Sequence, residues 1–177
     1  CVIPEGTPIH DLKKPPGNSL KSIWKLSRML KGLAPCVVHT RNWPGLDGIV
    51  AARLAGIRSV VHSEEGWNVA DLTGASRKRI LVRRFLSRWT RTFVSVSKDI
   101  EAWLRGTVRV KCPVVQIYNG LDTGVYAGAS TSAELKREVG LAPDALPVGI
   151  VARFDPTKDH PTLFRAFELV RKRFPKA

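Results

Sequence analysis

Short apolar runs alternate with helix-like segments along most of this chain, and this alternation constrains the fold more than any other feature. The runs lie at 37–38, 59–61, 92–96 and 114–118, and they have the length of buried strands. The segments between them carry apolar residues at three- and four-residue spacing, or begin and end with capping residues, as helices do. Strands and helices in alternation predict an α/β fold, in which helices cover a parallel sheet.

Capping residues predict several helix ends. Ser19 and Ser97 each precede a helix-like segment and are expected to be N-caps. Gly56 and Gly140 each follow one and are expected to end helices. Together with the apolar periodicity, these residues predict helices over 20–31, 46–55, 76–91, 98–105 and 132–139.

Polar residues follow three of the predicted strands. These groups run from His39 to Trp43, from His62 to Trp67 and from Asn119 to Asp122. The carboxyl ends of parallel strands share one edge of the sheet, where such folds bind ligands. His62, Glu64 and Glu65 suit acid–base chemistry or metal binding. One strand supplies all three without the spacing of a ligand set, so no metal is predicted. The alternative is that the histidine is a capped strand-end residue without chemistry of its own.

A different kind of site is predicted near the end of the chain. An apolar run over 147–151 suits a strand, a polar loop with Pro156 follows, and an amphipathic helix comes next. The loop offers Arg153 and Lys158 beside a helix N-terminus, a combination that suits a phosphate or diphosphate. The alternative is that both cations are solvated loop residues.

The chain is strongly basic, with a formal net charge of +14 and a pI of about 10.4. Several cations lie in the predicted helix over 76–91, and no acidic residue occurs between Leu72 and Lys98. Such charge favours acidic partners, namely nucleic acid, anionic lipid or a phosphorylated substrate. Two interpretations of the helix stay open: a solvated cationic face, or a platform for an anionic membrane surface or a phosphorylated acceptor.

The cysteines and the chain ends further limit which class of protein this chain can belong to. Cys1, Cys36 and Cys112 lie far apart without a CxxC pair, which disfavours a disulfide framework or a zinc site and fits a reducing cytoplasm. Cys36 and Cys112 are expected in or near the core. No apolar run is long enough to span a bilayer, and no secretory signal is visible. The irregular start, and a last strand and helix without partners, predict a fragment that lacks both ends.

Four segments of the chain match the motif order of a known enzyme family. They are H-T-x-N-W at 39–43, H-x-E-x-G-W at 62–67, I-Y-N-G-x-D-T at 117–123 and V-A-R-F-x-x-x-K-D at 151–159. They resemble family 4 (group 1) glycosyltransferases, whose C-terminal domain opens with V-G-R-L-x-x-x-K-D; here Ala152 replaces the glycine. The first three segments are most similar to sugar transferases of bacterial exopolysaccharide and PEP-CTERM systems.

The resemblance implies a GT-B fold built from two Rossmann-like domains. It assigns 1–122 to most of an acceptor-side N-terminal domain, 123–145 to a linker and helix, and 146–177 to the first strand and helix of a donor-binding domain. The implied reaction moves a hexosyl-type sugar with retention from a UDP- or GDP-sugar to a glycan or lipid-linked acceptor, in polysaccharide biosynthesis, without a metal or other cofactor. The implied location is the cytoplasm, with peripheral contact to the inner membrane face from Arg77 to Arg91.

The resemblance also implies residue roles. His62 is expected beside the transferred sugar as the catalytic residue, and Arg153 and Lys158 on the donor diphosphate, where they stabilise departing charge. The candidate acceptor-side residues are His39, Asn42, Glu64, Glu65 and Asn119, and Asn119 also matches a structural turn at the domain junction. The family's glycine-rich loop and its E-x7-E segment, which grips the donor sugar, are not in this sequence. The chain alone is therefore expected to be inactive.

Two other functions stay open from the sequence. A basic α/β module that binds RNA or DNA would explain the charge, but the chain has no RNP-like strand, KH loop or helix-turn-helix, so no nucleic-acid partner is expected. A non-catalytic nucleotide-binding domain would also use Arg153.

Overall fold

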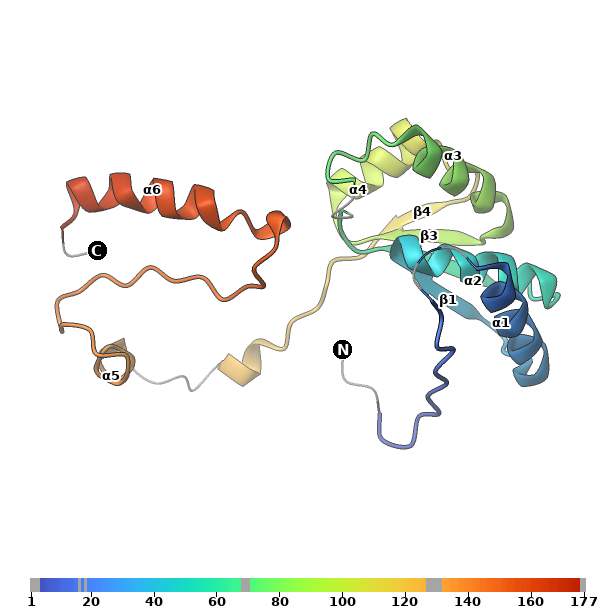
Figure 1. Ribbon diagram of the computed structural model, residues 1–177, viewed down its shortest axis with the longest axis horizontal. Coiled ribbons are helices and arrows are strands. Elements are labelled where there is room, and N and C mark those ends of the chain that lie inside the picture. The colour runs from blue at the N-terminus through green and yellow to red at the C-terminus, as the bar shows by residue number, and fades with distance from the viewer. Residues whose placement is uncertain (1–3, 16, 18, 68–70, 127–131, 176–177) are drawn as a thin grey trace. The chain divides into compact units, whose positions relative to one another are not determined.

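The computed structural model describes residues 4–15, 17, 19–67, 71–126 and 132–175. It divides the chain into two compact units, 1–119 and 120–177 (Figure 1). The assignment of these units to acceptor and donor halves stays a prediction.

A four-stranded parallel sheet forms the centre of the first unit. Its strands are β1 (Val38–Arg41), β2 (Val60–Glu64), β3 (Thr92–Ser95) and β4 (Val114–Gln116), and they lie side by side in sequence order. The register places Thr40 beside His62, and His62 beside Phe93. The α/β class and the Rossmann-like parallel sheet predicted from the sequence are confirmed.

The helices of the first unit begin at the predicted caps or close to the predicted positions. They are α1 (Leu20–Leu33), α2 (Asn42–Leu54), α3 (Arg77–Leu86), which continues as a 3₁₀ turn over Ser87–Trp89, and α4 (Lys98–Trp103), which continues as a π turn, η2 (Leu104–Val108). Both predicted N-caps are confirmed, because the Oγ atoms of Ser19 and Ser97 accept hydrogen bonds from the N–H groups of Ser22 and Ile100.

Two strand ends differ from the prediction. The groups starting at His39 and His62 were expected after their strands, but β1 extends through Arg41 and β2 through Glu64. Helix α2 follows β1 directly, four residues earlier than predicted, because the first turn of a helix tolerates Pro44. The polar side chains of β1 and β2 therefore point to alternate faces of the sheet, as side chains along a strand do.

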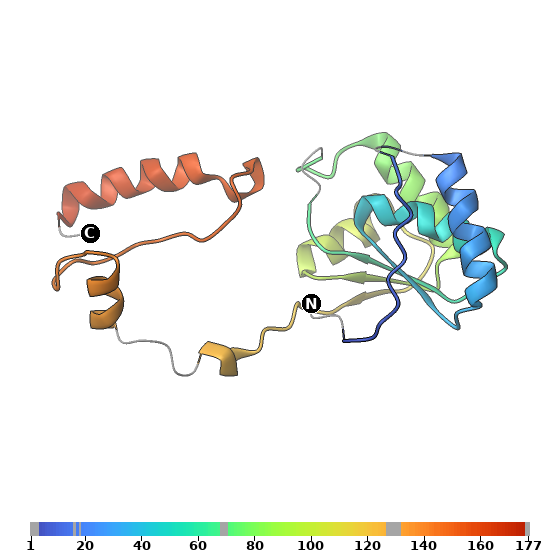
Figure 2. The same cartoon turned by 60° about the horizontal axis from the view of Figure 1, so that its bottom comes forward.

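The helices pack on one face of this sheet. One core cluster joins α1, α2 and α3 to Val60, and a second joins α4 and η2 to Phe93 and Val114. Figure 2 shows the helical layer above the sheet. Most residues of the opposite parity are less covered: Val61 and Val94 are half-buried and Val115 is 46% exposed, although Ser63 is buried. The unit is thus a two-layer structure with one well-buried sheet face.

Cysteine burial differs from the prediction at one position. Cys36 is exposed, whereas Cys112 is half-buried against the α4 core. Cys1 lies outside the described residues.

The regular secondary structure described in the second unit is helical. It contains the 3₁₀ turn η3 (Thr123–Tyr126), α5 (Ser132–Glu138), the 3₁₀ turn η4 (Pro156–Lys158) and α6 (His160–Arg173). Gly140 follows α5 with a φ of +72°, as its predicted role at a helix end requires. The strand predicted over 147–151 is wrong, since these residues belong to no strand. A strand forms only where a neighbouring strand accepts and donates its backbone hydrogen bonds.

Candidate functional site

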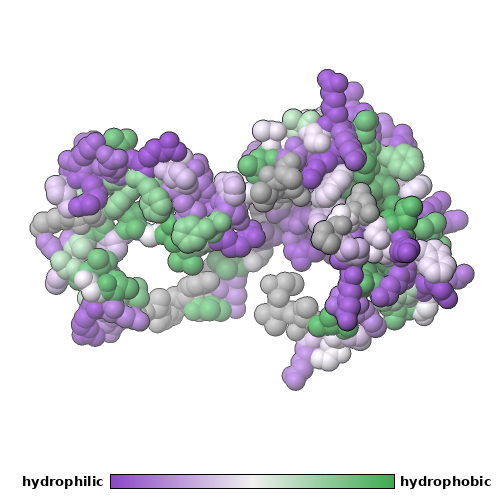
Figure 3. Space-filling model, in the orientation of Figure 1, coloured by the Kyte–Doolittle hydropathy of each residue, from purple (hydrophilic) through white to green (hydrophobic). Residues whose placement is uncertain are grey.

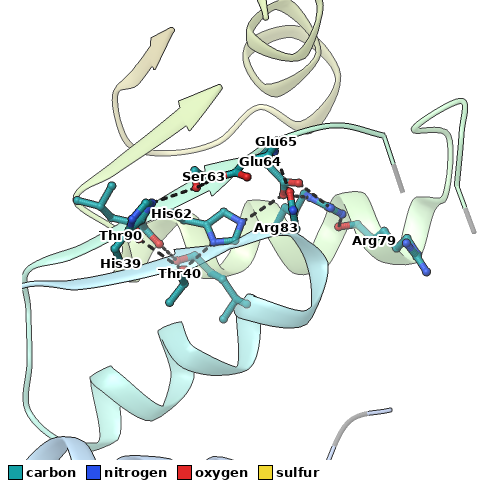
Figure 4. A network of polar contacts seen from close by, with 12 residues as sticks. His39, Thr40, His62, Ser63, Glu64, Glu65, Arg79, Arg83 and Thr90 are labelled. Carbon is teal, nitrogen blue, oxygen red and sulfur yellow. Dashed lines mark hydrogen bonds and ion pairs between the residues drawn. The ribbon is translucent and has the colours of Figure 1, made fainter. Parts of the chain in front are cut away.

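Strand alternation separates the polar residues of β1 and β2 into two clusters on opposite faces of the sheet (Figure 4). The inner cluster lies on the face covered by helices and consists of Thr40, His62, Glu64 and Arg83. The outer cluster lies on the other face and at its edge and consists of His39, Arg41, Asn42, Ser63 and Glu65. The sequence predicted that these polar groups would gather at one edge of the sheet and did not separate them by face.

The imidazole of His62 is the centre of the inner cluster and is completely buried, with 0% exposure. Its Nδ1 lies 2.7 Å from Thr40 Oγ1, and its Nε2 lies 3.3 Å from Glu64 Oε1. The ring also packs against Phe93, with 4.8 Å between ring centroids. Both ring nitrogens are therefore occupied inside the protein.

A buried ion pair joins β2 to helix α3. Arg83 donates from Nε to Glu64 Oε1 at 2.5 Å and from Nη2 to Glu64 Oε2 at 3.2 Å, and both side chains are buried. Burial acts to raise the pKa of Glu64, but hydrogen bonds from His62 and Arg83 outweigh it and hold the pKa below its usual value. Glu64 is thus an ionised carboxylate at neutral pH.

Two tryptophans enclose the guanidinium of this pair. The Arg83 guanidinium lies 5.0 Å from the ring centroid of Trp43 and 5.2 Å from that of Trp103, distances at which a cation is attracted to an aromatic face. Trp103 Nε1 donates to the Gly74 carbonyl at 3.0 Å, and Trp67 meets Trp103 edge-on. Trp103 therefore contacts both the guanidinium of Arg83 and the loop before α3.

The close approach of α2 to β1 also depends on the sequence. A Cβ atom at Gly48 would lie 2.8 Å from Thr40 Cγ2, so only glycine lets the helix pack on this threonine.

Sequence reasoning missed Thr40 and the internal role of Arg83. The available signal was the two-residue period of the two motifs, which puts Glu64 on the buried face and so requires a cation from another element.

The outer cluster brings together three of the predicted acceptor-side residues. His39 Nε2 lies 3.0 Å from Ser63 Oγ, which donates to Glu65 Oε1 at 3.2 Å. Arg41 pairs with Glu65, and its hydrogen bond, opposed by burial, lowers the pKa of that carboxyl. Asn42 Oδ1 accepts from the Glu65 N–H at 2.8 Å. Asn42 adopts a φ of +54°, a strained backbone conformation of the kind that clusters at functional sites.

The other predicted acceptor-side residues do not join the outer cluster. Glu64 belongs to the inner cluster, and Asn119 is exposed in the segment after β4.

Three arginines of the basic helix α3 have internal partners, and the guanidinium of Arg79 lies 4.7 Å from the ring centroid of Trp43. Arg83 pairs with Glu64, and Arg84 donates from Nε to the Val108 carbonyl at 2.6 Å and from Nη2 to the Thr107 carbonyl at 3.1 Å. Arg84 thereby satisfies carbonyls at the end of the π turn η2. The exposed cations of this region are Arg77, Lys78, Arg88 and Arg91.

An apolar groove of about 380 Å³ lies between α2 and α3 beside these cations. The side chains that line it include Trp43, Leu46, Val50, Lys78, Leu81 and Phe85. Leu81 and Phe85 are more than half exposed although they are large and apolar. Figure 3 shows apolar side chains, in green, among the hydrophilic side chains on the face of this unit that it draws.

The predicted diphosphate-binding residues lie in the second unit. Arg153 is 82% exposed and forms an ion pair of 3.2 Å with Asp155. Asp155 Oδ1 accepts from the Thr157 N–H at 2.9 Å, and the hydrogen bonds from Thr157 lower the pKa of the Asp155 carboxyl. Lys158 ends the turn η4 within the same loop and is exposed.

The loop that carries these cations leads directly into α6. Asp159, with a φ of +46°, caps α6 and accepts from the Thr162 N–H at 3.4 Å. His160 Nε2 lies 2.9 Å from the Arg153 carbonyl and ties the loop to the first turn of the helix. Arg153 and Lys158 are thus close in one loop, while their approach to His62, in the other unit, stays a prediction.

The described residues contain neither a metal-binding group nor a membrane-spanning helix. No three His, Cys, Asp or Glu side chains within 4–15, 17, 19–67, 71–126 and 132–175 are grouped as a metal ion would require. Among the helices described, none has both the length and the apolar composition to cross a bilayer.

A sequential parallel sheet, with polar clusters where β1 and β2 end, defines a Rossmann-like domain of the kind that binds ligands at a strand edge. The chain belongs to Glycosyltransferase Family 4, whose sequence profile matches residues 2–125. It is similar to the UDP-Gal:alpha-D-GlcNAc-diphosphoundecaprenol alpha-1,3-galactosyltransferase of Escherichia coli, with 28% identity over 145 residues. The match covers 79% of this chain and 38% of the length of that relative.

Proposed function

We propose that this chain belongs to a retaining glycosyltransferase that moves a hexosyl-type sugar from a UDP- or GDP-sugar to a lipid-linked or glycan acceptor. The family membership carries the proposal, and the relative supports it, because its name specifies a UDP-sugar donor and a diphosphoundecaprenol acceptor. The proposed reaction uses no metal and serves polysaccharide synthesis on the cytoplasmic side, including the exopolysaccharide systems that the motifs resemble. In this proposal His62 lies near the transferred sugar, and the outer cluster faces the acceptor.

The donor diphosphate is proposed to bind Arg153 and Lys158. The exposure of Arg153 supports this role, since its guanidinium is accessible and its ion pair with Asp155 lies at the surface, where water and salt weaken such pairs. A diphosphate offers two oxygens to the guanidinium fork and a second charge to Lys158.

Substitution of Arg153 tests the donor site. Arg153→Ala and Lys158→Ala are each expected to weaken UDP or GDP binding about 10- to 100-fold, because each removes a charge-assisted contact of about 1.5–3 kcal/mol. Calorimetric titration of the chain with UDP and with GDP measures this. Arg171→Ala, a matched loss of one exposed cation on α6, is expected to bind like the unsubstituted chain. Equal affinities for all variants would contradict the donor site.

Robust turnover of UDP-sugars by this chain would contradict its expected inactivity.

The face around α3 is proposed to contact an anionic membrane. The groove between α2 and α3 exposes Leu81 and Phe85, and Arg77, Lys78 and Arg88 lie on the same helix or its extension. Apolar side chains flanked by cations bind the interface of anionic bilayers, and each cation near such a surface adds about 1 kcal/mol. A lipid-linked acceptor would be presented at this surface.

Vesicle binding tests the membrane face. The double variant Arg77→Ala/Lys78→Ala is expected to bind vesicles containing phosphatidylglycerol about 30-fold more weakly in a sedimentation assay, because two cations are lost. The double variant Lys31→Ala/Arg58→Ala loses the same charge at exposed positions away from α3 and is the control. Equal weakening in both variants would indicate attraction by net charge alone. Salt-sensitive binding to DNA without vesicle binding would favour the nucleic-acid alternative.

A further inference from the structure

The inner cluster constrains where the proton of His62 resides. Glu64 is a carboxylate with both oxygens engaged by Arg83, so it accepts hydrogen bonds and donates none. The contact of 3.3 Å between His62 Nε2 and Glu64 Oε1 therefore needs a proton on Nε2.

Thr40 supplies the complementary group at the other ring nitrogen. Its hydroxyl has one proton, and the two acceptors within reach are His62 Nδ1 at 2.7 Å and the Val61 carbonyl at 3.4 Å. The shorter contact has the length of a strong hydrogen bond and the longer one is at the limit. Donation to Nδ1 leaves that nitrogen without a proton.

The charges around His62 indicate whether its imidazole ring is neutral or charged. The charged groups described next to His62 are Glu64 on its own strand and Arg83 on α3, and their charges cancel. The neighbouring strands contribute Thr40 and Phe93, which carry no charge. An imidazolium at 0% exposure would add one uncompensated buried charge, which is strongly unfavourable.

We infer that Thr40, Glu64 and Arg83 are positioning residues that hold the His62 ring neutral, in one orientation, with its proton on Nε2. Arg83 acts through Glu64, whose charge it cancels. The inference rests on the proposed function for its meaning in transfer: a histidine held in this way is a fixed, hydrogen-bonded part of the proposed site.

Nitrogen NMR of the histidine rings tests the inference on the chain itself and needs no substrate. Long-range ¹H–¹⁵N spectra distinguish protonated from unprotonated ring nitrogens, and His62 is assigned by elimination with His10→Gln, His39→Gln and His160→Gln. The expected result at neutral pH is a protonated Nε2 and an unprotonated Nδ1. A proton on Nδ1, alone or together with one on Nε2, would overturn the inference.

Paired substitutions test each positioning residue by the same signals. Thr40→Ser keeps the hydroxyl and is expected to keep the spectrum, whereas Thr40→Val is expected to shift the Nδ1 resonance because its donor is lost. Arg83→Lys keeps the charge and is expected to keep a neutral ring. Arg83→Met is expected to give a doubly protonated ring at neutral pH, since Glu64 then pairs with an imidazolium. A neutral ring in folded Arg83→Met would refute the role of Arg83.

The threonine pair remains decisive if Arg83→Met does not fold, because Thr40→Val preserves the shape of the side chain. Identical Nδ1 signals in Thr40→Val and Thr40→Ser would refute the role of Thr40. Failure of nucleotide binding would leave these spectra unchanged, so the proposed function and the state of His62 are tested separately.

Discussion

Replacing Arg83 with methionine is expected to lower the free energy of unfolding of the chain by about 3–5 kcal/mol, the usual cost of removing one partner of a buried ion pair. Glu64 is 3% exposed and would keep its charge without the bidentate guanidinium. Methionine keeps an apolar side chain between Trp43 and Trp103, so the loss of stability comes mainly from the missing positive charge. Urea unfolding followed by circular dichroism measures the change.

The expected loss depends on pH in a defined direction. In the unsubstituted chain the lowered pKa of Glu64 contributes stability that is complete above the ordinary value of 4.5 and is lost as pH falls through the lowered value. The Arg83→Met variant lacks the ion pair with Arg83, so it has less of this contribution to lose as pH falls. The difference between the two proteins should therefore shrink on acidification.

Two controls separate the ion pair from other effects of the change. Arg88→Met removes an exposed cation near the same helix and is expected to change stability by no more than about 0.5 kcal/mol. The double variant Glu64→Gln/Arg83→Met leaves no buried charge and is expected to lose less than Arg83→Met alone. Equal losses for Arg83→Met and Arg88→Met would mean that the Glu64–Arg83 pair is not buried in solution.

Gly74→Ala is expected to lower the free energy of unfolding by about 2–5 kcal/mol through two separate causes. Gly74 has a φ of +64°, a left-handed conformation that costs alanine about 1–2 kcal/mol. Its new Cβ atom would also lie 2.5 Å from Trp67 Cζ3 and 2.8 Å from Trp103 Nε1, and overpacking of this kind costs about 1–3 kcal/mol. Urea unfolding followed by tryptophan fluorescence measures the loss and the disturbance of both indoles.

Gly56→Ala is the matched control for Gly74→Ala. Gly56 has a φ of +83° in the same unit, but a Cβ atom there would meet nothing within 4 Å. Its loss is expected to come from backbone strain alone and to be the smaller of the two. Equal losses at both positions would argue that the loop before α3 moves away from the tryptophans at little cost.

The order of elements was predictable because it depends on local signals. Alternating apolar runs and capping residues such as Ser19 and Ser97 act over a few residues, and both caps are confirmed. The end of β2 was not predictable in the same way. His62 and Glu64 have the polarity of loop residues, and they continue the strand because Thr40 and Arg83, distant in the sequence, satisfy their polar groups.

The sequence predicted several residues of the candidate site correctly, but it did not predict how their side chains are arranged. The motifs indicated His39, Asn42 and Glu65, and the structure brings these three together. The internal partners of Arg83 and Arg84 depend on where α3 packs, which composition does not specify. The strand predicted at 147–151 was wrong because an apolar run can form a strand only beside another strand.

The one-sided covering of the sheet affects how this chain must be handled. Val115 and Ile117 leave apolar surface in water on and beside β4, and Val37 does so next to β1. Such surface favours self-association, and the open edges of outer strands add to that tendency. Unfolding curves, titrations and spectra of this chain therefore need dilution series, so that a change in oligomer content is not mistaken for a change in folding or affinity.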